Sequence, residues 1–208
     1  MSVPGAASPL FLATTGAAEF SIARSLRFNS ADSAYLNRTP SSASNRKKWT
    51  WSGWIKRSKL GAQMSIFTAG TNASTALDTI EFKSDDTLTV YSYNGSYSYN
   101  YVTSSVFRDV GAWFNLVVAL DTDDGTAGDR LKIYVNGTRI TSFGTASNPS
   151  SGLEGSFFNT ANPHNIGYQL SRFPGDFYLA EVNFVDGSAL APTSFGKTDD
   201  NGVWQAKD

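Results

Sequence analysis

Hydrophobic and polar positions form their clearest pattern in residues 113–143. Apart from Asn115, residues 114–120 are apolar on both parities, which is typical of a strand with protein on both faces near the middle of a sheet. An acidic, glycine-containing loop occupies residues 121–129, and the alternating segment after it is interrupted by Asn136-Gly137. Asn-Gly between alternating segments predicts a hairpin with a type I′ turn, because both central residues must adopt positive φ.

Similar short segments recur along the rest of the chain, and no long segment shows the helical period of about 3.6 residues. Alternation or short apolar runs predict strands at residues 25–28, 34–36, 49–57, 65–69, 79–83, 87–93, 165–168 and 177–184. Turn-forming residues separate these segments at intervals of about 8 to 12 residues. We therefore predict an all-β fold in which two antiparallel sheets pack as a sandwich.

The tyrosine-rich segment 90–102 can be assigned to faces by register, since opposed residues share a face. A two-residue turn at Asn94-Gly95 would give a core face that carries Leu88, Val90, Tyr97, Tyr99 and Tyr101. Tyr91 and Tyr93 would then point away from the core. The same arithmetic at Asn136-Gly137 predicts that one face carries Leu131, Ile133, Val135 and Ile140.

Three aromatic residues are expected to face outward. Trp54 is the large aromatic side chain on the polar side of the alternating segment 49–57, and Tyr91 and Tyr93 are the outward tyrosines. Aromatic faces can stack on the apolar side of sugar rings, so these residues form a candidate glycan platform. A protein interface, which favours tyrosine and tryptophan, or ordinary strand composition would account for them as well.

Basic and acidic residues are unevenly distributed, although the formal net charge is only -1. No acidic residue lies between Ser33 and Leu77, where the basic residues are Arg38, Arg46, Lys47, Lys48, Lys56, Arg57 and Lys59. A patch around Arg46, Lys47 and Lys48 could dock on an acidic partner. The alternative is a solvated loop and edge strand kept soluble by lysine. No nucleic-acid-binding motif accompanies the patch, and we predict no nucleic-acid partner.

Composition limits the class of protein. At 208 residues the chain fits a single domain that buries roughly 70% of its extended surface. It contains no cysteine, which excludes disulfides and thiolate metal sites. No apolar run approaches the roughly 18 residues that span a bilayer, so we predict no membrane association. The N-terminus lacks the basic region of a signal peptide.

Residues 1–24 differ in composition from the rest of the chain. They are rich in Ala, Gly, Ser, Thr and Pro and cannot build a core of their own. Some apolar residues nevertheless favour burial, and the candidate contacts are Leu10, Phe11, Leu12 and Phe20. We predict an extended arm that becomes ordered on a neighbouring molecule or along its own domain. The alternative is a flexible tail. The domain is expected at residues 25–195, and a polar tail at 196–208.

Candidate chemical groups are few. His164 is the single histidine, and no cysteine or second histidine can complete a transition-metal site, so we interpret it as a loop residue. Hard cations prefer carboxylate oxygens, and the loop residues that could suggest calcium are Asp121, Asp123, Asp124, Gly125 and Asp129. Their spacing is not that of an EF-hand, and the bidentate Glu is missing. We predict no metal and no cofactor.

Ordered blocks of sequence carry a family resemblance. In chain order they are S-L-R-F-N-S-A-D-S-A-Y-L, W-T-W-S-G-W-I-K, W-F-N-L-V-V-A-L-D, L-K-I-Y-V-N-G, H-N-I-G and G-D-F-Y-L-A-E-V-N-F-V-D-G-S-A-L. Across residues 25–195 they resemble the laminin-G-like branch of the concanavalin A-like jelly rolls. The ending L-A-E-V-N-F-V-D-G-S-A-L-A-P-T-S-F-G-K-T-D-D-N-G-V-W resembles a terminus of virion proteins from marine and cyanobacterial tailed phages.

The resemblance implies a protein used for recognition or surface decoration, without catalysis. Enzymes of this jelly-roll class carry acids on alternate positions of one strand, as in E-x-D-x-E, and Glu181 and Asp186 do not have that spacing. We expect a capsid decoration or cement protein on the surface of a phage particle. Its expected partners are the major capsid protein and copies of itself, because the short chain has no heptads or repeats with which to build a fibre. The alternatives are a tail-fibre or receptor-binding adhesin that recognises host glycan, and a secreted bacterial laminin-G-like module.

Overall fold

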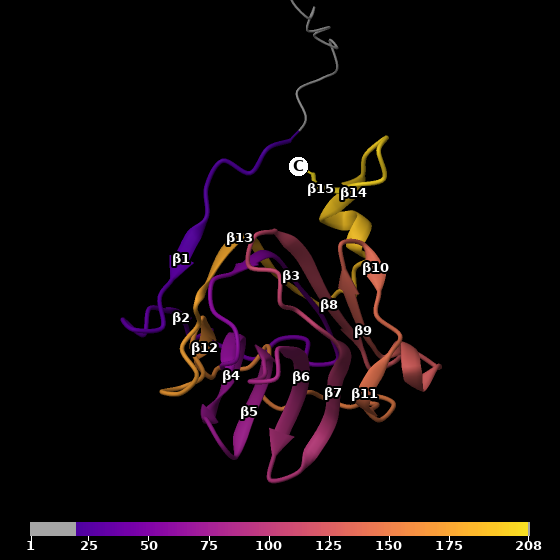
Figure 1. Cartoon of the computed structure of the whole chain (residues 1–208). Coiled ribbons are helices and arrows are strands. Elements are labelled where there is room, and N and C mark those ends of the chain that lie inside the picture. Colours follow the sequence, from indigo (N-terminus) through magenta and orange to yellow (C-terminus); the bar gives the residue numbers. More distant parts are fainter. Residues whose placement is uncertain (1–19, 208) are drawn as a thin grey trace, which may run out of the picture.

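The computed structural model describes residues 20–207, which form two large antiparallel sheets that face each other (Figure 1). Three of the predicted arm contacts, Leu10, Phe11 and Leu12, lie outside the described residues. The predicted two-sheet, all-β sandwich is confirmed. Only two short 3₁₀ turns interrupt the strands within the described chain, η1 (Ala127–Asp129) and η2 (Pro192–Ser194).

Sheet A contains, in spatial order, β1 (Leu26–Phe28), β13 (Phe177–Asp186), β3 (Lys48–Arg57), β8 (Phe114–Asp121), β9 (Leu131–Val135) and β10 (Thr138–Arg139). Sheet B contains β11 (Phe143–Ser147), β7 (Tyr97–Val106), β6 (Thr87–Asn94), β5 (Ala76–Phe82), β4 (Met64–Asn72), β12 (His164–Ile166) and β2 (Leu36–Arg38). A separate hairpin joins β14 (Gly196–Thr198) to β15 (Trp204–Ala206). No helix in the described part of the chain is long and apolar enough to cross a bilayer.

The hydrophobic core lies between the two sheets and takes residues from both. Sheet A contributes Trp49, Trp51, Ile55, Leu116, Val118 and Ile133, and sheet B contributes Phe67, Ile80, Phe82, Leu88, Val90 and Tyr99. Strand β8 is central, as predicted, because it pairs with β3 on one side and with β9 on the other. Its residues 115–120 are all buried, and all of them except Asn115 are apolar, which agrees with a strand that has protein on both faces.

The Asn136-Gly137 turn has the predicted geometry. Asn136 has φ of 47° and Gly137 has φ of 76°, and Val135 pairs with Thr138 across a two-residue loop. Leu131 and Ile133 are buried, and Val135 and Ile140 pack against the core. Local sequence chemistry alone therefore defines this corner of sheet A.

The Asn94-Gly95 turn differs from the prediction. Only Gly95 has positive φ, at 75°, and Tyr93 pairs with Tyr97, so the loop holds three residues. The register then shifts between Ser92 and Tyr93, which is a β-bulge. Tyr99 and Tyr101 are buried as predicted, but Tyr97 is 54% exposed, and its assignment to the core face is wrong. The bulge turns this one tyrosine outward.

Some elements have no clear pattern in the sequence. Strand β11 pairs with the edge of β7 in a region predicted as loop from residue 145, and four of its residues are exposed. The predicted polar tail contains the β14–β15 hairpin. Edge strands made of Gly, Thr, Ala and Ser lack the alternation that marks half-buried strands, so their pairing depends on the neighbouring strand.

Candidate functional site

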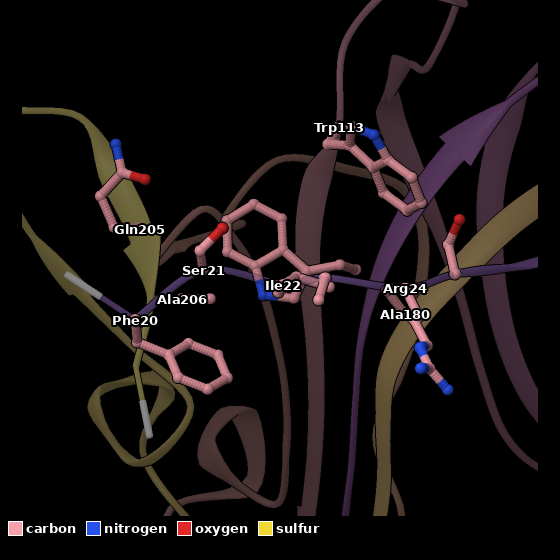
Figure 2. A pocket seen from close by; sticks show the side chains of 11 residues that line it. Phe20, Ser21, Ile22, Arg24, Trp113, Ala180, Gln205 and Ala206 are labelled. Atoms are coloured by element: carbon pink, nitrogen blue, oxygen red, sulfur yellow. The ribbon is translucent and has the colours of Figure 1, made fainter. Parts of the chain in front are cut away.

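Trp54 projects from the outer face of sheet A, but the rest of the chain covers it. Its side chain is only 9% exposed. The residues of its small apolar cluster are Ala180, Ala206, Phe20, Ile22 and Trp204. Figure 2 shows the first four of them around the neighbouring cavity. These residues come from β13, the described N-terminal segment and the C-terminal hairpin. The prediction that Trp54 belongs to an exposed platform is therefore corrected: residues 20–22 and 204–206 help to bury it.

A cavity of about 440 Å³ remains between residues 20–25 and the C-terminal hairpin. Trp113, which is 37% exposed, lines this cavity on one side. Figure 2 shows Gln205 on the other side. Phe20, predicted as an arm contact, packs near Trp54 in the same molecule. At Phe20, therefore, the predicted arm packs along its own domain.

The C-terminal hairpin is held to sheet A by Trp204. The indole Nε1 of Trp204 donates to Asn115 Oδ1 at 3.3 Å. A Cβ added to Gly137 would lie 2.5 Å from the Trp204 ring, and one added to Gly196 would be equally close to it. The glycine at position 137 is thus needed both for its positive φ and for the space that Trp204 occupies.

The outer face of sheet B carries a partly exposed aromatic cluster, which we call the tyrosine surface and define as Tyr91, Tyr93 and Tyr97. The Tyr97 ring lies 5.6 Å from that of Tyr91 and 4.8 Å from that of Tyr93, in edge-to-face arrangements. Tyr91 and Tyr93 are half-buried, whereas Tyr97 is 54% exposed. The structure thus brings the two predicted tyrosines together, adds Tyr97, and places Trp54 on the other sheet.

A loop of residues 167–175, here called the flap, adjoins the tyrosine surface. Its tip is a tight turn in which Gln169 and Arg172 exchange backbone hydrogen bonds of 2.9 Å in both directions. The Phe173 carbonyl accepts from the Ser65 N–H of β4 at 2.9 Å. Gln169 Nε2 donates to the Ala73 carbonyl at 3.0 Å and lies 3.5 Å from the Tyr91 hydroxyl. The flap therefore connects β4 and the β4–β5 turn to the tyrosine surface.

Glu81 is a buried acid on the same outer face of sheet B, since its neighbours Ile80 and Phe82 point into the core. Glu81 is 2% exposed; its Oε1 accepts from Gln63 Nε2 at 2.8 Å, and its Oε2 has no hydrogen-bond partner. Burial raises the pKa of Glu81 to about 7, and the hydrogen bond from Gln63 only partly offsets this effect. Nothing in the local sequence marked this residue, because the flap, whose Arg172 acts electrostatically on Glu81, comes from far along the chain.

Asp78 is the second buried acid of β5, and its role is structural. Its Oδ2 accepts from the backbone N–H groups of Phe157 and Phe158, each at 2.8 Å. Burial raises the pKa of Asp78, while these hydrogen bonds act in the opposite direction. Asp78 thus fixes the apolar pair Phe157-Phe158 against the core.

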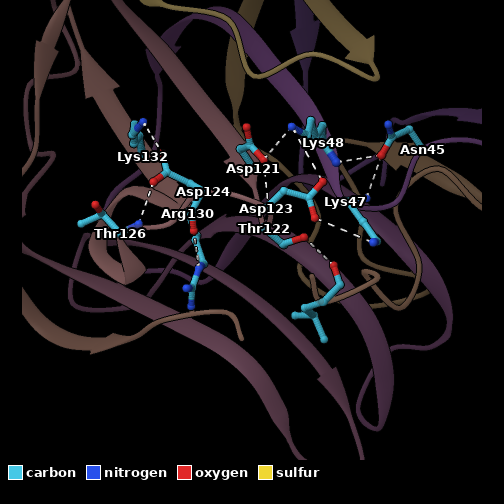
Figure 3. Close-up of polar contacts among 11 residues, drawn as sticks. Asn45, Lys47, Lys48, Asp121, Thr122, Asp123, Asp124, Thr126, Arg130 and Lys132 are labelled. Carbon is cyan, nitrogen blue, oxygen red and sulfur yellow. Dashed lines mark hydrogen bonds and ion pairs between the residues drawn. The ribbon is translucent and has the colours of Figure 1, made fainter. Parts of the chain in front are cut away.

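The basic stretch and the acidic loop pair with each other (Figure 3). Lys48 lies 3.1 Å from Asp121, and both Lys47 and Lys48 lie 3.8 Å from Asp123. Arg46 pairs with Glu154. The surplus of positive charge that predicted a docking patch at Arg46, Lys47 and Lys48 is therefore neutralised within the chain.

Further ion pairs engage Arg57 of the basic stretch and Asp124 and Asp129 of the acidic loop. Lys132 lies 3.5 Å from Asp124, and Arg139 lies 2.5 Å from Asp129. Arg57, from the basic stretch, is buried and binds Asp86 at 3.0 Å. Within residues 20–207, no group of three or more His, Cys, Asp or Glu side chains is placed to hold a metal ion.

His164 lies in strand β12 and not in a loop, which corrects the sequence-based interpretation. It is 7% exposed, its Nε2 accepts from the Asn159 N–H at 3.2 Å, and its Nδ1 lies 2.8 Å from the Asn162 carbonyl. Burial lowers the pKa of His164 below its ordinary value, so the ring is neutral near pH 7. It acts as a packed polar residue at the edge of the core.

A lectin-like β-sandwich with aromatic residues on its outer faces is the class that these features define. Residues 28–193 match the concanavalin A-like lectin/glucanases superfamily, and the chain belongs to that family. The laminin-G-like and concanavalin A-like assignment from the sequence is thus confirmed for the fold. No curated protein shows a significant match to the chain.

Solved structures with the same fold are distant in sequence. A candidate carbohydrate-binding protein from Bacteroides ovatus has a TM-score of 0.60 and 16% identity, covering 90% of this chain and 52% of its own. Domains LG4-5 of the mouse laminin alpha1 chain have a TM-score of 0.55 and 11% identity, covering 92% and 47%. The SAP-like pentraxin of Limulus polyphemus has a TM-score of 0.52 and 16% identity, covering 77% and 72%. The chain spans about half the length of the first two, and such identities show the fold alone.

Proposed function

We propose that this chain is a non-catalytic binding module that recognises glycan through the tyrosine surface. The observation that carries the proposal is the exposure of Tyr97 between the rings of Tyr91 and Tyr93. Such a cluster offers apolar faces for the C–H groups of a sugar ring and phenolic hydroxyls for its polar edge. The lectin-like family of the chain supports the same class of ligand.

The polar surroundings of the tyrosine surface suit a hydroxyl-rich ligand. The exposed Arg172 is held beside the surface by a hydrogen bond from its Nη1 to Ser74 Oγ at 2.6 Å. Sugar sites combine aromatic surface with a few such oriented polar groups.

The positions of the acids support a role without catalysis. Glycoside hydrolysis needs two carboxyl groups about 5 to 10 Å apart on either side of one bond. The two buried acids of β5, Asp78 and Glu81, project to opposite faces of sheet B, and Asp78 is bound to the backbone of residues 157–158. On β13, Glu181 is exposed, while Asp186 accepts from Asn45 and Asn159. We therefore expect no hydrolysis of polysaccharides by the purified chain.

A glycan microarray followed by calorimetry tests the proposal. The wild-type chain is expected to bind one glycan class, and Tyr97→Ala should weaken that binding at least about tenfold, which corresponds to ~1.4 kcal/mol. Tyr134→Ala is the matched control, because Tyr134 is a half-buried tyrosine on the outer face of β9 in sheet A, outside both the tyrosine surface and the flap. Absence of glycan binding, or equal losses in both variants, would contradict the proposal.

A second function, decoration of a tailed-phage particle, rests on a different observation. Strand β1 is one edge of sheet A and β2 is one edge of sheet B, and Leu26 and Leu36 on them are 54% and 48% exposed. Unpaired edges with exposed leucine are suited to contact with another protein. The resemblance of the C-terminal block to phage virion proteins supports this location, with the major capsid protein or further copies of the chain as partners.

Quantifying the protein in purified particles tests this second function. A copy number close to that of the major capsid protein would support decoration, and a few copies per particle would support a tail adhesin instead. Removal of residues 1–24 should abolish incorporation if the arm mediates docking. Complete absence from particles would leave the secreted bacterial module as the remaining assignment.

A further inference from the structure

The position of Glu81 links the flap to the tyrosine surface. On the outer face of sheet B, the cross-strand neighbours of Glu81 are Ser65 of β4 and Thr89 of β6. Tyr91 lies two residues beyond Thr89 and is therefore a diagonal neighbour of Glu81 on the same face. The flap bonds to Ser65 through Phe173 and reaches Tyr91 through Gln169. The flap therefore spans the region of sheet B that contains Glu81.

The flap is strained and its attachment is sparse. Three residues that are not glycine have positive φ within it: Leu170 at 45°, Ser171 at 89° and Phe173 at 50°. Each such conformation costs on the order of 1 kcal/mol, and strain of this kind concentrates at clamps and switch segments. Outside its own turn, the flap is joined to β4 by two hydrogen bonds, from Ser65 to Phe173 and from Gly167 to Ile66. Two more join it to the β4–β5 turn, and one joins it to Tyr91. Segments held in this way open at lower free energy than the core.

The polar groups beneath the flap are incompletely satisfied. Glu81 Oε2 and Gln169 Oε1 are both buried without a hydrogen-bond partner. Loss of a proton would leave a buried carboxylate with only the Gln63 amide as donor. A buried charge without adequate hydrogen bonds is costly, and opening the flap would admit the water that it needs.

We propose that the flap is a proton-controlled gate on the tyrosine surface, closed while Glu81 carries a proton and opening when that proton is lost. The gate itself depends only on Glu81 and the flap. Its effect on ligand rests on the proposed glycan function, because opening separates Gln169 from the Tyr91 hydroxyl and frees that hydroxyl for a sugar.

The charged groups around Glu81 determine the direction of the effect. Lys83, beyond the end of β5, and Arg172, in the flap, favour ionised Glu81, whereas Tyr91 on β6 is itself held neutral because burial raises its pKa. Ser65 and Thr89 on the flanking strands carry no charge. Desolvation is the largest influence on Glu81 and outweighs both cations, so its pKa in the closed state is about 7. The closed state therefore binds the proton more tightly than an open, hydrated state does.

Amide hydrogen exchange measured by NMR tests the gate. The reporters are the amides of Ser65 and Gly175, which donate to Phe173 and Gly167 across the closed flap, and Val118 in β8 is the core reference. After division by the intrinsic exchange rate, the opening equilibrium in the wild-type chain should rise by up to about tenfold per pH unit between about pH 5 and 7. Glu81→Gln should abolish this rise, and the exposed Glu154→Gln should retain it.

Each outcome of the exchange experiment bears on the gate. A rise of equal slope in Glu81→Gln, or no rise in the wild-type chain, overturns it. Loss of protection at Val118 in Glu81→Gln would mean that the variant is destabilised as a whole. In that case the carboxyl group of Glu81 is titrated by ¹³C NMR in the wild-type chain. The gate then requires the amide shifts of the flap to change with the same pH midpoint as Glu81. Absence of glycan binding at every pH would refute the proposed function while leaving the gate intact. A failed exchange experiment would refute the gate while leaving the tyrosine surface as the candidate site.

Discussion

The outer faces of the two sheets carry aromatic clusters that differ in what covers them. On sheet A, Trp54 is 9% exposed beneath residues from both ends of the described chain. On sheet B, Tyr97 is 54% exposed and touches only its neighbouring tyrosines among aromatic rings. Sequence alternation predicts outward aromatic residues in both places. The comparison shows that the outward direction of a side chain does not make it a ligand site; the rest of the chain decides whether it remains free.

Removal of the covered tryptophan should have the largest effect on stability. Trp54→Ala takes away the centre of the cluster formed with Phe20, Ala206 and Trp204, and large-to-small changes at buried aromatic positions cost about 3 to 5 kcal/mol. The free energy of unfolding, measured by urea denaturation, should fall by about 3 kcal/mol or more. Glycan affinity per folded molecule should be unchanged. A loss of affinity with little loss of stability would reverse the roles assigned to the two clusters.

The second-largest effect should be the pH dependence that Glu81 confers beside the tyrosine surface. Its pKa is raised from 4.5 to about 7 on folding, so its contribution to stability is fully present below about pH 4.5 and is lost as the pH rises through about 7. The expected loss is about 3 kcal/mol.

The Glu81 contribution is isolated by comparing the wild-type chain with Glu81→Gln. The glutamine keeps the shape and the hydrogen bond to Gln63 but cannot ionise. The difference in unfolding free energy between the two proteins should change by about 3 kcal/mol from pH 4.5 to pH 8, in favour of the variant at high pH. Parallel pH profiles would mean that Glu81 is hydrated in solution.

Matched glycine substitutions in the two hairpins should differ in their cost to stability, by a smaller amount than the effects above. Gly95 and Gly137 have φ of 75° and 76°, but a Cβ at Gly95 meets nothing within 4 Å, whereas one at Gly137 would lie 2.5 Å from the Trp204 ring. Gly95→Ala should therefore cost only the backbone strain, about 1 kcal/mol. Gly137→Ala should cost more, about 2 to 3 kcal/mol, because it also displaces the hairpin that covers sheet A. Equal losses by thermal denaturation would indicate that Trp204 does not dock there.

Tyr97→Ala should have the smallest effect on stability. An exposed side chain away from buried features changes stability by about 0.5 kcal/mol or less. The same variant is expected to lose glycan affinity. It should therefore lose affinity while keeping its stability, whereas Trp54→Ala should lose stability while keeping its affinity. A destabilisation comparable to that of Trp54→Ala would place Tyr97 in the core, contrary to its observed exposure.

The sequence patterns that succeeded are local ones. The parity of residues 114–120 and the dihedral demands of Asn136-Gly137 correctly predicted a central strand and a hairpin. The Asn94-Gly95 corner failed because a bulge, which no short motif marks, changed its register by the end of β6 and exposed Tyr97. In the same way, edge strand β11 forms only because β7 offers free backbone groups.

The candidate site was only partly predictable because contacts distant along the chain define it. Tyr91 and Tyr93 could be found from alternation, but the burial of Trp54 depends on residues 20–22 and 204–206. The flap residue Arg172, which acts electrostatically on Glu81, likewise comes after β12. No acidic residue lies near Lys47 and Lys48 in the sequence. In the structure, however, Asp121 and Asp123 at the end of the paired strand β8 lie within 4 Å of them. Clusters of one charge sign in sequence say little about surface charge when sheet pairing brings an acidic segment beside them.

An NMR titration of the ¹⁵N-labelled chain, with the oligosaccharide that binds best on the microarray, tests the central claim most directly. The account predicts that amide shifts concentrate in residues 91–97 and in the flap, with no change at residues 20–25 or 204–206. Shifts confined to the cavity beside Trp54 and Trp113 would contradict it and would assign binding to the outer face of sheet A.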